Sequence, residues 1–235
     1  MRFGTVSVIL SAIMALALSA CGSDAPPSPQ PRENVADENT DPRPVMGEER
    51  VILAFGDSLF AGYGLKKGES YPAKLETALR AKGINARIIN AGVSGDTTAA
   101  GLQRIKFVLD SQPDKPDLAL VELGGNDLLR GLSPAEARAN LDGIMEELQR
   151  RKIPVLLMGM RAPANLGEAY QREFDGLYPY LAEQYDAGLV PFFLEAVADK
   201  PELIQQDHVH PTARGVEEIV GATADDVIAA LPPED

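Results

Sequence analysis

Three residues, one early and two late in the chain, have the types and spacing of a catalytic serine, acid and histidine. Ser58 lies three residues after the apolar run 51–55, and Asp207 precedes His210 by three residues. A serine hydroxyl attacks a carbonyl carbon only when a base accepts its proton, and a histidine oriented by a carboxylate supplies that base. These residues therefore predict acyl-group chemistry, with Ser58 as nucleophile, His210 as base and Asp207 as the orienting acid.

Four short motifs, in this order along the chain, resemble the signature blocks of the SGNH (GDSL) hydrolases. They are Gly56-Asp57-Ser58-Leu59, Asn90-Ala91-Gly92, Gly124-Gly125-Asn126-Asp127, and Asp207 with His210. Three further stretches are similar to one branch of that family, the arylesterases or multifunctional acyl-CoA thioesterase I and lysophospholipases: Gly95-Asp96-Thr97-Thr98, Arg161-Ala162-Pro163-Ala164-Asn165 and Pro191-Phe192-Phe193. Each motif alone is commonly only a turn or a helix cap, but their order over residues 50–231 favours this family.

The resemblance also implies which groups stabilise the negative charge that develops on the substrate oxygen. They are the backbone N–H groups of Ser58 and Gly92 and the side-chain amide of Asn126. Because glycine has no side chain, the N–H of Gly92 can approach a substrate closely. The implied reaction is hydrolysis of carboxylic esters or thioesters through an acyl-enzyme, without a cofactor.

Apolar residues next to these motifs are candidates for the wall of an acyl-binding pocket. They are Leu59, Phe60, Leu128, Leu129, Ala162, Pro163 and Leu166. We expect about half of them to be ordinary core residues, since large apolar side chains are mostly buried. Small residues at positions 162 and 164 leave room for a substrate, which favours hydrophobic acyl or aryl esters.

His208 departs from the family pattern. Together with His210 it forms a His-x-His spacing that can bind a metal ion with help from carboxylates. A structural zinc site takes about four protein ligands and a catalytic one about three, whereas this chain has two histidines and one cysteine. We therefore expect His208 to be a loop or rim residue, and we expect no metal.

Five apolar and β-branched runs alternate with segments of helical spacing, which is typical of a parallel sheet covered by helices. The runs are 51–55, 86–89, 118–123, 154–158 and 189–193. Ser133 begins a capping box before one apolar stripe, and Gly83 follows another as a helix-terminating glycine. This pattern predicts a doubly wound α/β domain, and the resemblance narrows it to a three-layer α/β/α, flavodoxin-like fold with a mainly parallel five-stranded sheet.

Ser58, Gly92 and Asn126 each follow the carboxyl end of a predicted strand. Open α/β sheets bind their ligands at that edge. We therefore expect these three residues, distant in sequence, to converge there.

The first 20 residues are typical of an export signal. Arg2 is a short basic region, and the apolar stretch 6–18 is too short to span a bilayer but suits a signal peptide. The run Leu18-Ser19-Ala20-Cys21 resembles a bacterial lipobox, which implies that Cys21 carries the lipid. We expect an exported lipoprotein at the periplasmic face of the outer membrane; an ordinary signal peptide with an incidental cysteine is the alternative.

The composition of residues 21–50 predicts a disordered tether between the lipidated cysteine and one folded domain. Residues 22–50 hold six prolines, and seven acidic residues against three basic ones. Such a segment buries too little apolar surface to offset the entropy lost on ordering. The hydrolase domain then spans 51–231, which is long enough for a full core, and 232–235 form a short tail.

The formal net charge of −13 disfavours nucleic-acid binding, which depends on clustered lysine and arginine. The chain contains neither a G-x-S-x-G nucleophile elbow nor a phosphate-binding G-x-x-x-x-G-K-[ST] loop. We expect a monomer whose partners are a small lipophilic ester or thioester and, through Cys21, a membrane. Two alternatives stay open: a carbohydrate O-acetylesterase on the same fold, and a non-catalytic binding lipoprotein.

Overall fold

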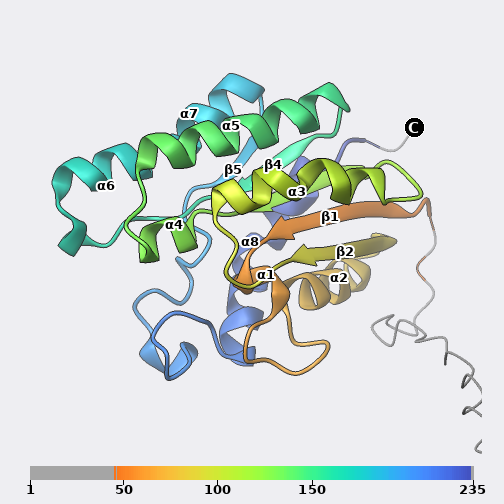
Figure 1. The fold of residues 1–235 in the computed structure, drawn as a ribbon. Coiled ribbons are helices and arrows are strands. Elements are labelled where there is room, and N and C mark those ends of the chain that lie inside the picture. Colours follow the sequence, from red (N-terminus) through yellow and green to blue (C-terminus); the bar gives the residue numbers. More distant parts are fainter. Residues whose placement is uncertain (1–44, 46, 234–235) are drawn as a thin grey trace, which may run out of the picture. The chain divides into compact units, whose positions relative to one another are not determined.

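The computed structural model describes residue 45 and residues 47–233 (Figure 1). The predicted signal peptide, Cys21 and most of the predicted tether lie outside the described residues. Within the described part, none of the helices combines the length and the apolar character that crossing a membrane requires.

The centre of the domain is one sheet of five parallel strands in the order β2-β1-β3-β4-β5. The strands are β1 (Arg50–Gly56), β2 (Ala86–Gly92), β3 (Leu118–Glu122), β4 (Val155–Met158) and β5 (Gly188–Val190). Helices cover both faces of this sheet, so the predicted three-layer α/β/α fold with a five-stranded parallel sheet is confirmed.

The helices fall into two groups. Helices α2 and α8 pack together on one face of the sheet, and α3, α5, α6 and α7 form the layer on the other (Figure 1). The helical elements are α1 (Ser58–Ala61), α2 (Tyr71–Ala81), α3 (Thr98–Asp110), α4 (Gly125–Leu129), α5 (Pro134–Arg150), η1 (Ala164–Leu166), α6 (Glu168–Asp175), α7 (Leu177–Tyr185), η2 (Pro201–Leu203) and α8 (Ala213–Ala230).

The inner strands are apolar along their whole length because both of their faces are covered. Every residue of β1, β3 and β4 is buried, whereas the edge strand β2 is mostly half-buried. Central parallel strands therefore appear as continuous apolar runs and not as alternating patterns. This explains why the runs in the sequence predicted the strands well.

The predicted helix signals also form. The side chain of Ser133 caps α5 by accepting the N–H of Glu136, with Pro134 at the first helical position. The apolar stripe of that helix is buried against the sheet: Leu141, Ile144, Met145 and Leu148. Gly83 follows α2 with a φ of +88°, the left-handed conformation that ends many helices at glycine.

The last strand is shorter than predicted. The apolar run 189–193 continues past Val190, but β5 ends there. Pro191, which follows, has no N–H to donate to a strand. Phe193 instead donates its N–H to the oxygen of Gly159, and its side chain is buried in the core.

The two strands that follow β1 in the chain lie on opposite sides of it, so the direction of winding reverses at β1. From β1 it goes to β2 on one side, and then returns to place β3 on the other. Ligands bind at such a switch point, beyond the carboxyl ends of the strands. Ser58 follows β1 there, and Asn126 follows β3.

Candidate active site

The structure brings Ser58, His210 and Asp207 into one hydrogen-bonded chain. His210 Nε2 lies 2.8 Å from Ser58 Oγ, and His210 Nδ1 lies 2.7 Å from Asp207 Oδ2. A proton on Nδ1, facing the carboxylate, leaves Nε2 as an acceptor for the serine hydroxyl proton. This is the geometry that a serine nucleophile requires.

Asp207 is held in its charged form. Partial burial opposes ionisation, but the backbone N–H groups of His210 and Val209, both 3.0 Å from Oδ1, and the His210 ring together lower the pKa of Asp207 to about 2. The carboxylate therefore stays ionised from weakly acidic to alkaline pH. It can orient the imidazole and stabilise the imidazolium that forms when the serine proton moves.

Ser58 is the first residue of a four-residue helix, α1. Asp57 caps this helix by accepting the N–H of Leu59 at 3.0 Å. Gly56 precedes the turn, and a Cβ at that position would collide with the backbone oxygen and the carboxyl of Glu122. The Gly-Asp-Ser sequence thus lets the nucleophile leave the end of β1 in a tight turn.

The loop that carries His210 is fastened by Gln205. The backbone N–H of Gln205 donates to the oxygen of His210 at 2.7 Å. Its side-chain amide donates to the oxygens of Tyr63 and Pro211, each at 2.9 Å. The Tyr63 ring also packs against the imidazole of His210, with centroids 4.5 Å apart. These contacts join the histidine loop to the segment that follows the serine.

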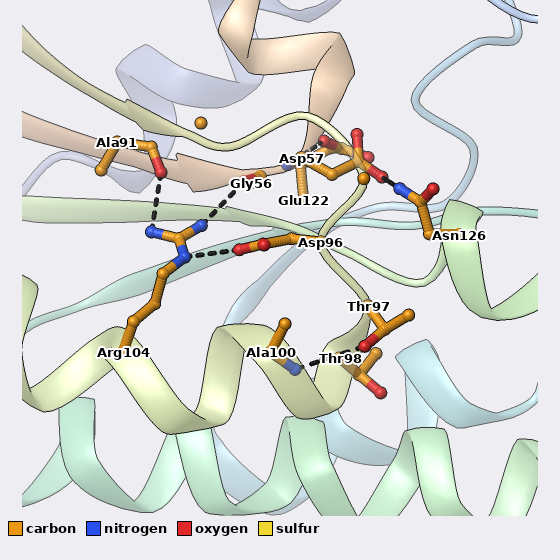
Figure 2. A network of polar contacts seen from close by, with 12 residues as sticks. Gly56, Asp57, Ala91, Asp96, Thr97, Thr98, Ala100, Arg104, Glu122 and Asn126 are labelled. Atoms are coloured by element: carbon orange, nitrogen blue, oxygen red, sulfur yellow. Dashed lines mark hydrogen bonds and ion pairs between the residues drawn. The ribbon is translucent and has the colours of Figure 1, made fainter.

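Asn126 of α4 points toward the same turn (Figure 2). Its Nδ2 donates to Asp57 Oδ2 at 2.8 Å. This bond uses one of the two amide hydrogens and fixes the side chain. The second hydrogen remains for a substrate oxygen.

One pocket of about 400 Å³ lies over these groups and includes Ser58 and Asn126 in its lining. Five of the predicted wall residues also line it: Leu59, Leu128, Leu129, Pro163 and Leu166. The wall is largely apolar, which suits the acyl chain or aryl group of a lipophilic ester.

Residues 54–217 match the GDSL-like Lipase/Acylhydrolase family. The chain belongs to this family. It is 40% identical over 161 residues to "Thioesterase 1/protease 1/lysophospholipase L1" of Escherichia coli (strain K12), a match that covers 68% of this chain and 75% of that protein. It is 42% identical over 160 residues to "Arylesterase" of Vibrio mimicus, covering 68% of this chain and 79% of that protein.

Solved structures agree with this assignment. AlinE4, described as an SGNH-hydrolase family esterase, is 86% identical with a TM-score of 0.68, covering 80% of this chain and 100% of that chain. TesA is 35% identical with a TM-score of 0.73, covering 77% of this chain and 100% of that chain. The protein is therefore an ester-bond hydrolase of the SGNH type, and the predicted family and enzyme class are confirmed.

Two of the predicted wall residues do not line the pocket of this hydrolase. Phe60 is fully buried and stacks on Tyr71, with centroids 5.3 Å apart. Successive helical residues point about 100° apart, since one turn takes 3.6 residues, so Leu59 faces the pocket while Phe60 enters the core. Ala162 is also buried in the core, where its N–H donates to Asp175.

Several wall residues were not predicted from the sequence. Met160, Leu194 and Val209 complete the apolar lining. Val209 could have been found, because it lies between the two histidines of the last motif. Met160 and Leu194 carry no motif of their own, and only the fold places them at the site.

Gly92 does not lie where the resemblance implied. Its N–H donates to Asn90 Oδ1 at 2.9 Å, and it is not part of the pocket lining. A Cβ at Gly92 would collide with the backbone of Phe60 and Ala61. The structure therefore corrects the prediction: this glycine allows α1 to pack closely on β2, and its N–H is already engaged.

His208 lies on the exposed loop before His210 and lines the pocket, as expected for a rim residue. Its φ of +60° is uncommon for a residue with a side chain. Among the described residues, no group of three or more histidine, cysteine, aspartate or glutamate side chains is arranged to hold a metal ion.

Arg104 of α3 joins the ends of β1 and β2 beside the site. Its guanidinium donates to the backbone oxygens of Gly56 and Ala91, both at 2.9 Å, and pairs with Asp96 at 2.5 Å (Figure 2). It also lies over the Phe55 ring, 4.0 Å from the centroid. The planar guanidinium can serve all these partners at once. No local pattern marks this residue in the sequence.

Proposed function

We propose that this SGNH hydrolase cleaves small lipophilic carboxylic esters and thioesters through an acyl-enzyme formed on Ser58. The observation that carries the proposal is the continuous chain from Ser58 Oγ to His210 at 2.8 Å and from His210 to Asp207 at 2.7 Å. Ser58, at one end of this hydrogen-bonded chain, lines a largely apolar pocket together with Asn126.

The reaction takes place in two halves. Ser58 Oγ attacks the carbonyl carbon while His210 Nε2 takes the hydroxyl proton, and Asp207 stabilises the resulting imidazolium. The tetrahedral intermediate then collapses, and His210 returns the proton to the departing alcohol or thiol. A water molecule, deprotonated by His210, next attacks the acyl-enzyme and releases the carboxylic acid and free Ser58.

The oxyanion in both halves needs hydrogen-bond donors. We assign this role to the N–H of Ser58, the amide of Asn126 and, in place of Gly92, the N–H of Gly95. Gly95 has a φ of +86°, and its N–H has no acceptor among the described residues. Its oxygen accepts from Arg130, the residue at the carboxyl end of α4, which is the helix that carries Asn126.

The substrate class follows from the apolar wall of the pocket and from the relatives. Proteins named arylesterase, thioesterase and lysophospholipase are 40% identical or more over about two thirds of this chain. We propose aryl esters and lysophospholipids as substrates. Rates for aryl esters of increasing acyl length, compared with rates for acetylated sugars, test this choice. A clear preference for acetylated sugars would instead indicate a carbohydrate O-acetylesterase.

Replacing Asn126 by alanine removes one oxyanion donor while the nucleophile and base remain. We expect kcat to fall by about 10²–10³-fold, the usual cost of one such donor. KM should change little, because this interaction strengthens only in the transition state. Steady-state kinetics on an aryl ester measure both values. An Asn126→Ala enzyme with the kcat of the wild type would exclude the role assigned to this amide.

We further propose that the enzyme is exported and anchored through a lipid on Cys21, at the periplasmic face of the outer membrane. The lipobox-like sequence before Cys21 and the apolar stretch 6–18 support this location. Two or more acyl chains on one residue give stable anchoring, because each buried CH₂ contributes about 0.8 kcal/mol. An exported enzyme rarely meets coenzyme A thioesters, so lysophospholipids and small lipophilic esters suit this location better.

The Cys21→Ala variant tests the anchor separately from the site. We expect it to leave the membrane fraction, while the esterase rate per molecule stays that of the wild type. The reason is that Cys21 and the catalytic residues lie on opposite sides of the predicted tether. Cell fractionation and an activity assay of each fraction measure both properties. Equal membrane retention of wild type and variant would contradict the proposal.

A further inference from the structure

Glu122 is a buried acidic residue that the proposed mechanism does not use. It is the last residue of β3, pairs in register with Gly56 of β1, and has an exposed fraction of 0%. Its Oε2 accepts the N–H of Asp57 at 3.2 Å. Its Oε1 is buried and finds no hydrogen-bond donor among the described residues. A negative charge on this side chain would therefore be poorly compensated.

The surroundings of Glu122 favour its neutral form. Burial raises the pKa of Glu122 well above its usual value, and the negative charge of Asp57 raises it further. Another titratable group close to Glu122 is Tyr178 of α7, a buried side chain whose hydroxyl donates to the oxygen of Leu123 at 2.9 Å. No described cation pairs with Glu122.

Burial also raises the pKa of Asp57, but hydrogen bonds from Leu59 and Asn126 lower it, so Asp57 is better placed than Glu122 to carry the charge. Its two oxygens accept the N–H of Leu59 at 3.0 Å and the amide of Asn126 at 2.8 Å. The carboxyl groups of Asp57 and Glu122 lie close together in Figure 2, so a proton on Glu122 could be shared with Asp57. Two carboxyl groups can share a hydrogen bond only when one of them keeps its proton.

We propose that Glu122, as a neutral carboxylic acid, is a positioning residue that holds Asp57 in place and thereby directs the amide of Asn126 toward the substrate oxygen. Glu122 touches neither the substrate nor the reacting atoms. The inference rests on the proposed function of Asn126. The position of Glu122 also helps to explain why residue 56 is a glycine, because a Cβ there would lie 2.8 Å from Glu122 Oε2.

Two substitutions separate the effect of charge from that of hydrogen bonding. In Glu122→Gln the amide can still donate to Asp57 and still accept its N–H, so kcat should stay within about threefold of the wild type. In Glu122→Leu both bonds are lost, and kcat should fall by about tenfold or more with KM nearly unchanged, which is less than the full loss of one oxyanion donor. Melting temperatures show whether both variants are folded. If they are, a Glu122→Gln enzyme as slow as Glu122→Leu would overturn the proposal.

A double variant shows whether Glu122 acts through Asn126. If it does, Glu122→Leu combined with Asn126→Ala should be no slower than Asn126→Ala alone, because the group being positioned is already absent. Losses that multiply would mean that Glu122 acts elsewhere. If Asn126→Ala alone is as fast as the wild type, the oxyanion role proposed for Asn126 fails. If only Glu122→Leu is as fast as the wild type, the inference about Glu122 fails.

The charge of Glu122 can also be observed without the leucine variant. The infrared C=O stretch of a protonated carboxyl group should be present in the wild type near pH 7 and missing from Glu122→Gln. Identical spectra of the two proteins in this region would show that Glu122 is ionised, and would overturn the proposal even if the leucine variant does not fold.

Discussion

Replacing His210 by alanine is expected to abolish turnover, whereas replacing His208 should leave most of it. His210 alone is in contact with both Ser58 and Asp207, at 2.8 and 2.7 Å. Without that base the serine proton has no acceptor, and loss of a triad member commonly costs about 10⁴–10⁶-fold in kcat. His208 lies at the rim of the pocket, so His208→Ala should lower activity only a few-fold. Initial rates on one aryl ester compare the two variants directly.

The same pair of variants separates a serine triad from a metal site. If both histidines held a catalytic metal, both substitutions would be comparably severe and a chelator would inactivate the wild type. We expect full wild-type activity in excess EDTA. Inactivation by EDTA that is reversed by added zinc would disprove the triad.

Replacing Ser58 by alanine removes the nucleophile itself. We expect kcat to fall by about 10⁶-fold, as for other serine hydrolases that lose this group. The fold should be unchanged, because the Ser58 side chain lies at the pocket and not in the core. A fluorophosphonate probe, which reacts with activated serines, should label the wild type but not Ser58→Ala.

The probe experiment also tests the non-catalytic alternative. If the purified wild-type protein fails to react and shows no esterase activity, a binding lipoprotein becomes the better interpretation. Labelling of Ser58→Ala to the level of the wild type would mean that another residue is the nucleophile.

Most of the fold could be predicted because its signals are local. The run 51–55 shows that a strand is buried on both faces, and the capping box at Ser133 is complete within four residues. The end of β5 was less predictable, since the apolar run continues past Pro191 into residues that enter the core without belonging to the sheet.

The site was predicted unevenly, for a physical reason. The motifs give the identities of Ser58, Asn126 and His210, and their position after strands predicts that they meet. A motif does not show which acceptor a backbone N–H group finds in the fold. The N–H of Gly92 donates to the side chain of Asn90, which the motif alone does not predict. Residues that act by long-range contact, such as Arg104, leave no pattern in the sequence.

The histidine lies 152 residues after the serine, on a loop just before α8. Helix α8 docks on α2 through the hydrogen bond between Tyr71 and Thr223 at 2.7 Å, and through the ion pair of Lys74 with Glu217. A chain emerging from the ribosome therefore has its nucleophile long before its base. We therefore expect the enzyme to stay inert during synthesis, and to gain its activity once the His210 loop has been made and helix α8 has packed against α2.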